Sequence, residues 1–457
     1  MEKLDVCLIN DSFPPLIDGV ANAVFNYASI IQKELGSAVV ATPELPGVQD
    51  NYDFQVLRYP SIDTTKAVGY RTGIPFNPPY LTQFNERNID IIHSHCPITS
   101  TYLARILREQ TKSPIVLTYH TKFDIDIRKA IDSKLLQEVA INALVSNIQG
   151  VDEVWAVSHG AGENLKSLGY KGDYIVMHNG VDFTKGASSK KAVEAFRSER
   201  GLNDGKPIYL FVGRMMWYKG IRIIVDALSE LKKHGIGFHM LFIGDGVDRR
   251  EIQQYIEEKD LTAECIFTGS ISDRKLLKTA FSASDLFLFP STFDTNGIVV
   301  REAAAAGLGS VLIRNSCAAE DTLDGVNTIQ IEENAESLAK ILIQAGNNTD
   351  YFHRIGKNAQ KQLYMSWKEA VEHAYERYKV VVEKYEYQPR NPLDISDSFF
   401  GMWADISQSI SKAKQNRQEF VRRLEETARE IRRTGEMISY RRGEIKEYLD
   451  DMMDRYL

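Results

Sequence analysis

The sequence has few of the features that mark a secreted or membrane-spanning chain. No uncharged run approaches the roughly 20 residues that a membrane helix needs. The apolar run between Asp5 and Asp11 is too short and too charged for a signal peptide. Four cysteines are scattered without C-x-x-C or zinc-like spacing, and we expect them to be reduced and mostly buried. They are Cys7, Cys96, Cys265 and Cys317. These absences predict a cytoplasmic protein, at most peripheral at the inner face of the cell membrane.

The sequence also lacks a strong excess of charge of one sign. Its 457 residues include 55 Lys and Arg against 62 Asp and Glu, for a formal net charge of −7. Because there is no overall basic field, nucleic acid is not expected as a partner. The composition, 43% hydrophobic and 26% charged, excludes wholesale disorder. The length fits two globular domains better than one core.

Short apolar runs alternate with amphipathic helical patterns, as is typical of parallel sheets with crossover helices. The predicted strands cover 4–9, 90–93, 114–118, 152–157, 207–213, 238–243, 264–268, 286–289 and 310–313. One predicted helix follows the first strand and carries Val20, Val24 and Ala28 on one face. Another follows the strand at 207–213 and carries Ile221 and Leu228. The pattern predicts an α/β fold with two doubly wound, Rossmann-like domains facing each other across a cleft.

The polar stretch Asp182–Lys206 separates the two series of strands. We therefore expect an N-terminal domain over 1–184 and a C-terminal domain over 185–385. Residues 386–392 contain two prolines and read as a linker.

An amphipathic helical extension is predicted over 393–457. Apolar residues recur there every seven positions, with Arg417 as the exception; they are Trp403, Ile410, Leu424, Ile431, Ile438, Ile445 and Met452. The companion heptad positions are mixed, so the pattern fits a long amphipathic helix better than an ideal coiled coil. Packing on the chain's own body and self-association into a homo-oligomer are both open. A membrane-lying helix is less favoured, because acidic and basic residues balance.

The segment Phe289–Gly307 is the most informative for chemistry. A strand ends there in a polar loop with Asp294, Asn296 and Gly297, and a helix follows with Glu302 about one turn inside it. Glycine at a helix N-terminus lets backbone N–H groups approach an anion, and the helix dipole favours phosphate. Carboxylates beside it can accept hydrogen bonds from sugar hydroxyls. An ordinary strand-to-helix turn is the alternative.

A pair of cations favours the phosphate interpretation. Arg214 follows the strand at 207–213, and Lys219 opens the next helix. Cations at the carboxyl edge of a strand can hold a diphosphate and stabilise it as a leaving group. The pair and the later glycine together predict one nucleoside diphosphate site.

With these residues in place, the sequence resembles the retaining family 4 glycosyltransferases, which have the GT-B fold. The resemblance covers about residues 3–385. The motifs of this chain are most similar to those of bacterial enzymes that glucosylate diacylglycerol. The motifs that carry it include FPPLIDGVANAV (13–24), TYHT (118–121), HNGVD (178–182), VGRMMWYKG (212–220), IGDG (243–246), FTG (267–269) and PSTFDTNGIVVREAAAAG (290–307).

The resemblance implies that the domain over 1–184 lies on the acceptor side and that the domain over 185–385 binds the nucleotide sugar, with its final helices crossing back. It also implies a role for each matching residue. Asp294 would contact the donor sugar and Glu302 the ribose hydroxyls, while Arg214 and Lys219 would hold the diphosphate. Gly19 would bring backbone close to the donor, and His120 would lie near the transferred sugar. The phosphate cradle would be the amides around Asn296, Gly297, Ile298 and Val299. Of these residues, the catalytic set would be His120, Asp294, Arg214 and Lys219.

The predicted activity is transfer of a hexose, with glucose and UDP as the expected sugar and nucleotide, to a hydroxyl of a lipid or saccharide acceptor. Residues 1–180 are net acidic, which argues against simple capture by anionic lipid. The family usually has Glu where this chain has Asp294, so a catalytically weak accessory subunit acting through the C-terminal helix stays as the alternative. A phosphorylase or hydrolase is disfavoured.

No cofactor and no essential metal are expected. Asp124 and Asp126 have D-x-D spacing, but they lie away from the predicted diphosphate site. His93 and His95 point to one side of a strand without an evident third ligand.

Overall fold

A computed structural model describes residues 3–16, 18–65, 71–292, 297–388 and 395–413, together with Glu426. Within this part the chain forms two compact units. The first comprises Met1–Thr118, Ala130–Val154 and Glu376–Leu457, and the second Tyr119–Lys129 and Trp155–Tyr375. The domain boundaries drawn from the sequence stay a prediction.

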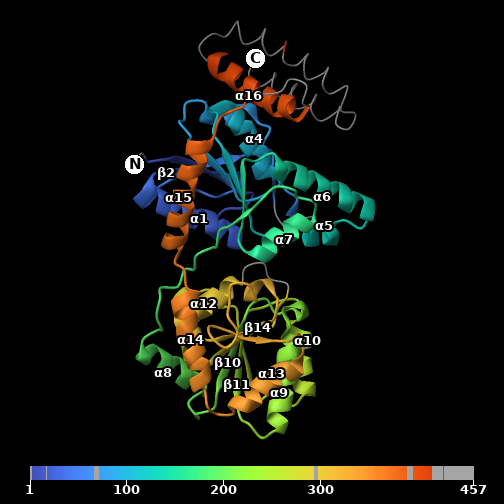
Figure 1. The fold of residues 1–457 in the computed structure, drawn as a ribbon, viewed down its shortest axis with the longest axis vertical. Coiled ribbons are helices and arrows are strands. Elements are labelled where there is room, and N and C mark those ends of the chain that lie inside the picture. The colour runs from blue at the N-terminus through green and yellow to red at the C-terminus, as the bar shows by residue number, and fades with distance from the viewer. Residues whose placement is uncertain are drawn as a thin grey trace. The chain divides into compact units, whose positions relative to one another are not determined.

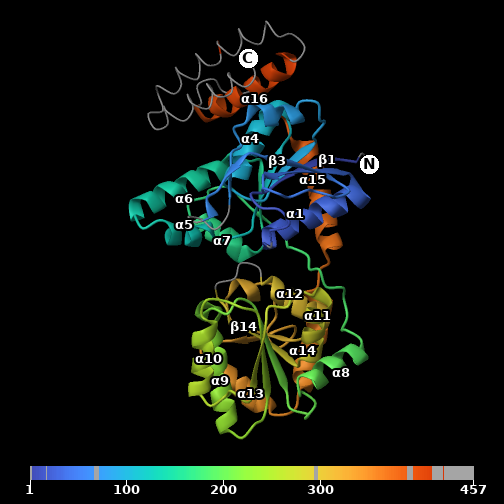
Figure 2. The same ribbon diagram turned by 180° about the vertical axis from the view of Figure 1, so that it is seen from behind.

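The chain up to residue 181 alternates strands with helices, as the apolar pattern predicts (Figures 1 and 2). Its strands are β1 (Asp5–Ile9), β2 (Ser37–Pro43), β3 (Gln55–Tyr59), β4 (Ser61–Ile62), β5 (Thr72–Gly73), β6 (Ile91–Ser94), β7 (Ile115–Tyr119), β8 (Glu153–Ala156) and β9 (Ile175–Val176). Its α-helices are α1 (Gly19–Ile30), α3 (Pro78–Leu81), α4 (Thr99–Thr111), α5 (Phe123–Ala130), α6 (Lys134–Gln149) and α7 (His159–Ser167). A π-helical turn, η1 (Ile31–Leu35), continues α1, and a 3-10 turn, η2 (Thr82–Phe84), follows α3.

The remaining chain repeats the alternation. Its strands are β10 (Ile208–Val212), β11 (His239–Ile243), β12 (Cys265–Gly269), β13 (Leu286–Phe289), β14 (Ser310–Ile313) and β15 (Ile329–Ile331). Its helices are α8 (Lys190–Glu199), α9 (Ile221–Lys233), α10 (Arg249–Glu258), α11 (Arg274–Ala283), α12 (Ile298–Ala306), α13 (Ala335–Ala345), α14 (Asp350–Gln362), α15 (Trp367–Lys384) and α16 (Ile395–Ala413). The 3-10 turns η3 (Trp217–Lys219) and η4 (Cys317–Ala319) precede α9 and follow β14.

The strands form two large sheets and one small one. Their orders are β3-β2-β1-β6-β7-β8-β9 and β12-β11-β10-β13-β14-β15, and β4 pairs antiparallel with β5. Every neighbouring pair of the six-stranded sheet is parallel. In each sheet the first strand in the sequence lies inside the order, with later strands added on both sides. This is the doubly wound arrangement that the sequence predicts.

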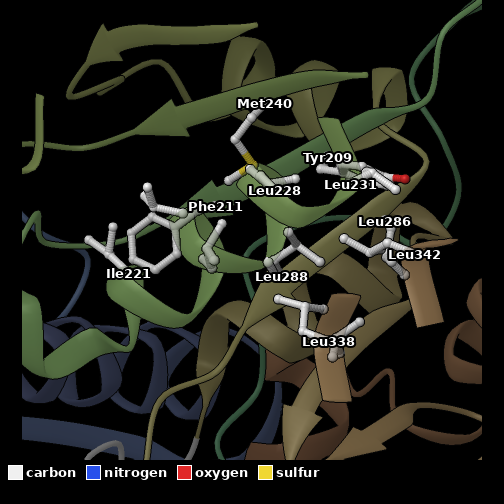
Figure 3. Close-up of a cluster of buried hydrophobic side chains, with 14 of the residues drawn as sticks. Tyr209, Phe211, Ile221, Leu228, Leu231, Met240, Leu286, Leu288, Leu338 and Leu342 are labelled. Atoms are coloured by element: carbon white, nitrogen blue, oxygen red, sulfur yellow. The ribbon is translucent and has the colours of Figure 1, made fainter. Parts of the chain in front are cut away.

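The six-stranded sheet of the second unit is buried on both faces, because alternate residues of each strand point to opposite sides. Tyr209, Phe211, Leu286 and Leu288 pack on one side with α9, α10 and α13 (Figure 3). Leu210 and its neighbours on the other strands pack on the opposite side with α8, α11 and α12. The carboxyl edge of this sheet is therefore held by two hydrophobic cores.

In the first unit, α16 takes part in the hydrophobic core. It packs on α4 and α3, with Phe400, Trp403 and Ile406 buried together with Leu103 and Leu107 of α4. Arg105 lies over the Phe400 ring, 4.1 Å from its centroid. Of the interpretations of the extension, packing on the chain's own body is the one found for 395–413. The rest of the heptad series, Leu424 to Met452, lies outside the described residues.

The second half of α15 is also bound in the first unit. Tyr378 is fully buried and its hydroxyl contacts Nδ1 of His93. Arg377 donates from Nε to Glu153 at 2.9 Å. Beyond α15, the Tyr387 hydroxyl donates to Glu109 at 2.9 Å.

Among the described residues, no helix combines the length and apolarity needed to cross a membrane. All four cysteines are free; Cys7 and Cys96 are buried and Cys265 and Cys317 partly so. Burial raises the pKa of the Cys7 and Cys265 thiols to about 12, so both stay protonated at neutral pH.

Candidate active site

The candidate cations lie at the carboxyl end of β10. Arg214 is exposed just after the strand, whereas Lys219 is 8% exposed at the end of η3. The aromatic ring of Tyr218 lies between them in the sequence, with its centroid 6.0 Å from the Arg214 guanidinium carbon and 5.4 Å from the Lys219 Nζ. Both cations therefore gather around one side chain at this edge of the sheet.

The loop that carries Lys219 is fixed by neighbouring backbone and carboxylates. The Asp248 side chain accepts from the Trp217 N–H at 2.9 Å and so holds the start of η3. Gly220 has a φ of +76°, and a Cβ there would lie 1.9 Å from the carbonyl oxygen of Pro290. Only glycine permits this approach. The contact places the Lys219 loop directly against the start of the segment 290–297.

Gly297 forms the N-terminus of α12. It has a left-handed φ of +51°, and a Cβ would meet the Ala318 Cβ at 3.0 Å. Among the described residues, Gly297 at the N-cap offers no side chain to this helix end. The backbone N–H groups of a first helical turn, here those of Ile298 and Val299, favour an anion. Asp294 and Asn296 lie outside the described residues.

Glu302 is held in a charged cluster on α12. The residue as a whole is 7% exposed, and its carboxylate accepts a hydrogen bond from the Arg274 guanidinium of α11. The same Arg274 Nη2 lies 3.4 Å from Asp182. Burial raises the pKa of the Glu302 carboxyl, Asp182 adds to this, and the Arg274 charge opposes it. We call Asp182, Arg274 and Glu302 the carboxylate clamp.

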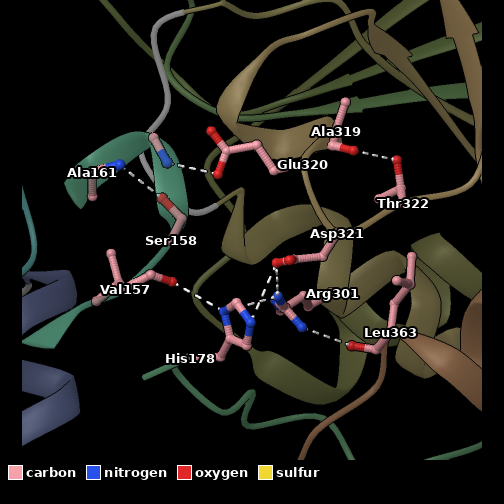
Figure 4. A network of polar contacts seen from close by, with 11 residues as sticks. Val157, Ser158, Ala161, His178, Arg301, Ala319, Glu320, Asp321, Thr322 and Leu363 are labelled. Atoms are coloured by element: carbon pink, nitrogen blue, oxygen red, sulfur yellow. Dashed lines mark hydrogen bonds and ion pairs between the residues drawn. The ribbon is translucent and has the colours of Figure 1, made fainter. Parts of the chain in front are cut away.

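A second polar network lies on the neighbouring face of α12 (Figure 4). Arg301 donates to the Leu363 carbonyl at 3.2 Å and lies 3.3 Å from Asp321 and 3.2 Å from His178 Nδ1. His178 Nε2 lies 3.3 Å from Asp321. Burial and the Arg301 charge lower the pKa of His178, while Asp321 opposes them. Nδ1 also lies 3.1 Å from the carbonyl oxygen of Val157, which can accept a hydrogen bond only when Nδ1 carries a proton.

In the same region, Glu320 binds the N-terminus of α7. Its carboxylate accepts from the Gly160 N–H at 2.6 Å (Figure 4), where the helix dipole favours a negative charge. A Cβ on Gly160 would lie 2.3 Å from the Cys317 sulfur and 2.4 Å from Glu320 Oε1. Gly160 therefore allows η4 and the residues after it to pack closely on α7.

The structure places the remaining predicted residues as follows. His120 directly follows β7 and is 7% exposed. Gly19 is the first residue of α1, after the N-cap Asp18, and is exposed in the first unit. The arrangement thus brings Lys219 and the start of the α12 loop together, and it pairs Glu302 with Arg274.

His93 and Asp124, each from a pair with spacing that metal ligands can have, form hydrogen bonds within the protein. His93 contacts Tyr378 through Nδ1 and Thr118 through Nε2, the latter at 2.7 Å. Asp124 accepts from Asn164 at 3.2 Å. Within the described parts of the chain, no group of three or more candidate metal ligands occurs.

Comparison with known proteins now bears on this arrangement. Residues 17–185 match the family described as Glycosyltransferase Family 4, and residues 192–362 match the one described as Glycosyl transferases group 1. The two matches together span most of the chain. The chain belongs to the family 4 glycosyltransferases. As such, it transfers a sugar from a nucleotide-sugar donor.

Individual relatives of this glycosyltransferase are distant in sequence. The chain is 24% identical over 368 residues to the alpha-monoglucosyldiacylglycerol synthase of Acholeplasma laidlawii, covering 77% of this chain and 91% of that protein. It is 23% identical to the GDP-mannose-dependent alpha-mannosyltransferase of Corynebacterium glutamicum, with coverages of 73% and 78%. The names of these relatives differ in the sugar, which is glucose in the first and mannose in the second.

Solved structures confirm the GT-B fold of the glycosyltransferase. Sucrose-phosphate synthase from Thermosynechococcus elongatus aligns with a TM-score of 0.66 at 18% identity, covering 84% of this chain and all of that one. Anabaena HepE in complex with UDP aligns with a TM-score of 0.64 at 17% identity, covering 82% and 100%.

Two members of the carboxylate clamp were not predicted as site residues. Asp182 ends the HNGVD motif and so had a signal in the sequence. Arg274 follows FTG by five residues at the start of a helix, where an exposed basic residue is ordinary. Its contact with Glu302 forms only where α11 packs on α12.

Proposed function

We propose that this glycosyltransferase is a retaining hexosyltransferase that moves glucose from UDP-glucose to a hydroxyl of a lipid or saccharide acceptor. The observation that carries the proposal is the combination of a buried Lys219 beside the α12 loop with a buried, ion-paired Glu302 one turn inside α12. The name of the Acholeplasma relative supports glucose and diacylglycerol. The complex of Anabaena HepE with UDP-glucose supports the donor.

In the proposed reaction, Lys219 and Arg214 bind the diphosphate and Glu302 accepts hydrogen bonds from the ribose hydroxyls. The bond between the anomeric carbon and the phosphate oxygen breaks while the acceptor oxygen bonds to the same face. The acceptor proton passes to the departing phosphate oxygen, so UDP leaves with it. The cations stabilise the charge that develops on that phosphate, and no protein nucleophile is needed. His120 and Asp294 are assigned to the sugar.

The test is substitution of the two residues that carry the proposal. Lys219→Ala and Glu302→Ala should each reduce both UDP release and sugar transfer by at least about 100-fold, because charge stabilisation of the leaving group is lost. Both are followed by mass spectrometry with UDP-glucose and either diacylglycerol vesicles or oligosaccharides. Lys259→Ala, which removes a surface lysine paired with Asp226 at 3.0 Å, is the matched control. Full activity of either site variant would refute the assignment.

The stereochemistry is tested on the product. Because UDP-glucose is an α-glucoside, retention predicts an α-linked product, which NMR of the anomeric proton distinguishes from the β anomer. A β-linked product would contradict the retaining mechanism while leaving the glycosyltransferase activity in place.

A further inference from the structure

The carboxylate clamp contains Glu302, the residue that the proposed function assigns to the ribose of the nucleotide. Glu302 is expected to accept hydrogen bonds from ribose hydroxyls, and it can do so with full strength only as a carboxylate. Yet its side chain is only 9% exposed, and burial raises its pKa. A buried carboxyl without compensation tends to take up a proton. Something must therefore keep Glu302 ionised.

Arg274 has the geometry to do this. Its guanidinium donates to Glu302 Oε1 and lies 3.4 Å from Asp182 Oδ2. The guanidinium carbon lies 4.5 Å from the centroid of the Phe183 ring, which is itself buried. The Arg274 guanidinium is restrained by stacking on this ring and by its two carboxylate partners, so it has little freedom to turn away from Glu302.

The other side of the clamp is anchored as well. Asp182 Oδ1 accepts from the Trp367 indole N–H at 2.8 Å, and Trp367, the first residue of α15, is 5% exposed. The chain of contacts therefore runs from Trp367 through Asp182 and Arg274 to Glu302. Within the described residues, Arg274 of α11 and Asp182 are the charged groups that act on the Glu302 carboxyl. Arg274 is the cation of the pair.

We propose that Arg274 is a positioning residue for the nucleotide: it keeps the Glu302 carboxylate charged and aimed for the ribose hydroxyls, supported by Asp182 and Trp367. The inference rests on the proposed function, since it needs Glu302 to bind ribose. Arg274 itself need not touch the donor.

The test compares UDP binding by calorimetry at pH 6.0 and pH 8.5 in wild type, Arg274→Gln and Arg274→Lys. Removing the cation lets the pKa of Glu302 rise, so a larger fraction is protonated at the lower pH. A rise of one pKa unit changes the population of the carboxylate by up to about tenfold. We therefore expect Arg274→Gln to bind UDP more weakly than wild type at pH 6.0, by up to about tenfold, and the loss to be smaller at pH 8.5. Arg274→Lys, which keeps the charge but lacks the fork, should fall between.

Two controls separate this effect from general damage. Arg314→Gln removes another arginine of similar exposure, 42% against 44%, that also bridges two carboxylates, Asp324 and Glu332, in the same unit. It should leave UDP affinity unchanged at both pH values. Since the ionisation of UDP itself is common to all variants, it cancels in the ratio to wild type.

A second ligand identifies the contact. Wild type should prefer UDP over 2′-deoxyUDP, because the latter lacks a hydroxyl, and Arg274→Gln should show less of this preference at pH 6.0. Failure of wild type to bind UDP would overturn the proposed function and this inference together. The inference alone would be overturned if wild type binds UDP and Arg274→Gln binds it equally well or more tightly. It would also be overturned if the ratio of the two affinities is the same at pH 6.0 and pH 8.5.

Discussion

Adjacent residues of α12 serve two different networks. Glu302 joins Arg274 and Asp182, whereas Arg301 joins His178, Asp321 and the Leu363 carbonyl. One helix turn thus anchors both the proposed ribose contact and the segment around His178. Charges buried in this way stabilise a fold only while their partners remain.

The His178 network makes stability depend on pH. Because the pKa of His178 is lowered in the folded protein, the unfolded chain takes up a proton first as pH falls below about 6.5. The stability that the neutral ring contributes is therefore fully present above that pH, and it is lost as pH falls from about 6.5 through the folded pKa. We expect the urea midpoint of wild type to drop more between pH 7.5 and 5.5 than that of His178→Gln. Equal drops in the two proteins would contradict the lowered pKa.

At the residue scale, the candidate site residues come from groups that stand in motifs, and their roles stay predictions. Lys219, Gly297 and Glu302 were predicted because their chemistry depends on short spacing along one strand, loop and helix. Arg274 was not predicted, because its partner is 28 residues away and the pair forms only through helix packing. Asp294 and Asn296 remain predictions from the sequence.

At the scale of elements, all nine strands predicted from apolar runs are present, with ends that differ by one residue at most. Buried parallel strands give continuous apolar runs that are easily seen. The strands that were not predicted are β2, β3, β4, β5, β9 and β15. β3 begins with an exposed residue and is only partly buried, β15 has three residues, and β4, β5 and β9 have two each. The amphipathic pattern of the extension predicted a helix, but not the α4 surface on which 395–413 packs.

The packing of α16 predicts a stability effect. Phe400 is 5% exposed and lies in the core with α4, so Phe400→Ala should lower the free energy of unfolding by about 3–5 kcal/mol. Chemical denaturation measures this. Trp403→Phe is the control, because it keeps an aromatic ring and removes an indole N–H that is buried without a partner among the described residues. It should cost less than about 1 kcal/mol. An unchanged free energy of unfolding in Phe400→Ala would show that α16 contributes little to stability.

For the whole molecule, two compact units imply two unfolding transitions that respond to different changes. Lys219 and Glu302 lie in the second unit, so UDP at 100 times its Kd should stabilise that transition by about 2.7 kcal/mol. Phe400→Ala should lower the other one. Calorimetry with and without UDP checks both expectations. One transition that shifts with both changes would show that the units unfold together.

The glycine at position 220 has a consequence for attempts to change the donor. Since its α-carbon faces the Pro290 carbonyl with no room for a methyl group, the spacing between the lysine loop and the α12 loop is set by main chain rather than by side chains. Libraries that seek new sugar or base preferences should therefore fix position 220 and vary the residues that follow Pro290. Substitution of Gly220 is expected to lower activity with every donor by a similar factor and to leave donor selectivity unchanged.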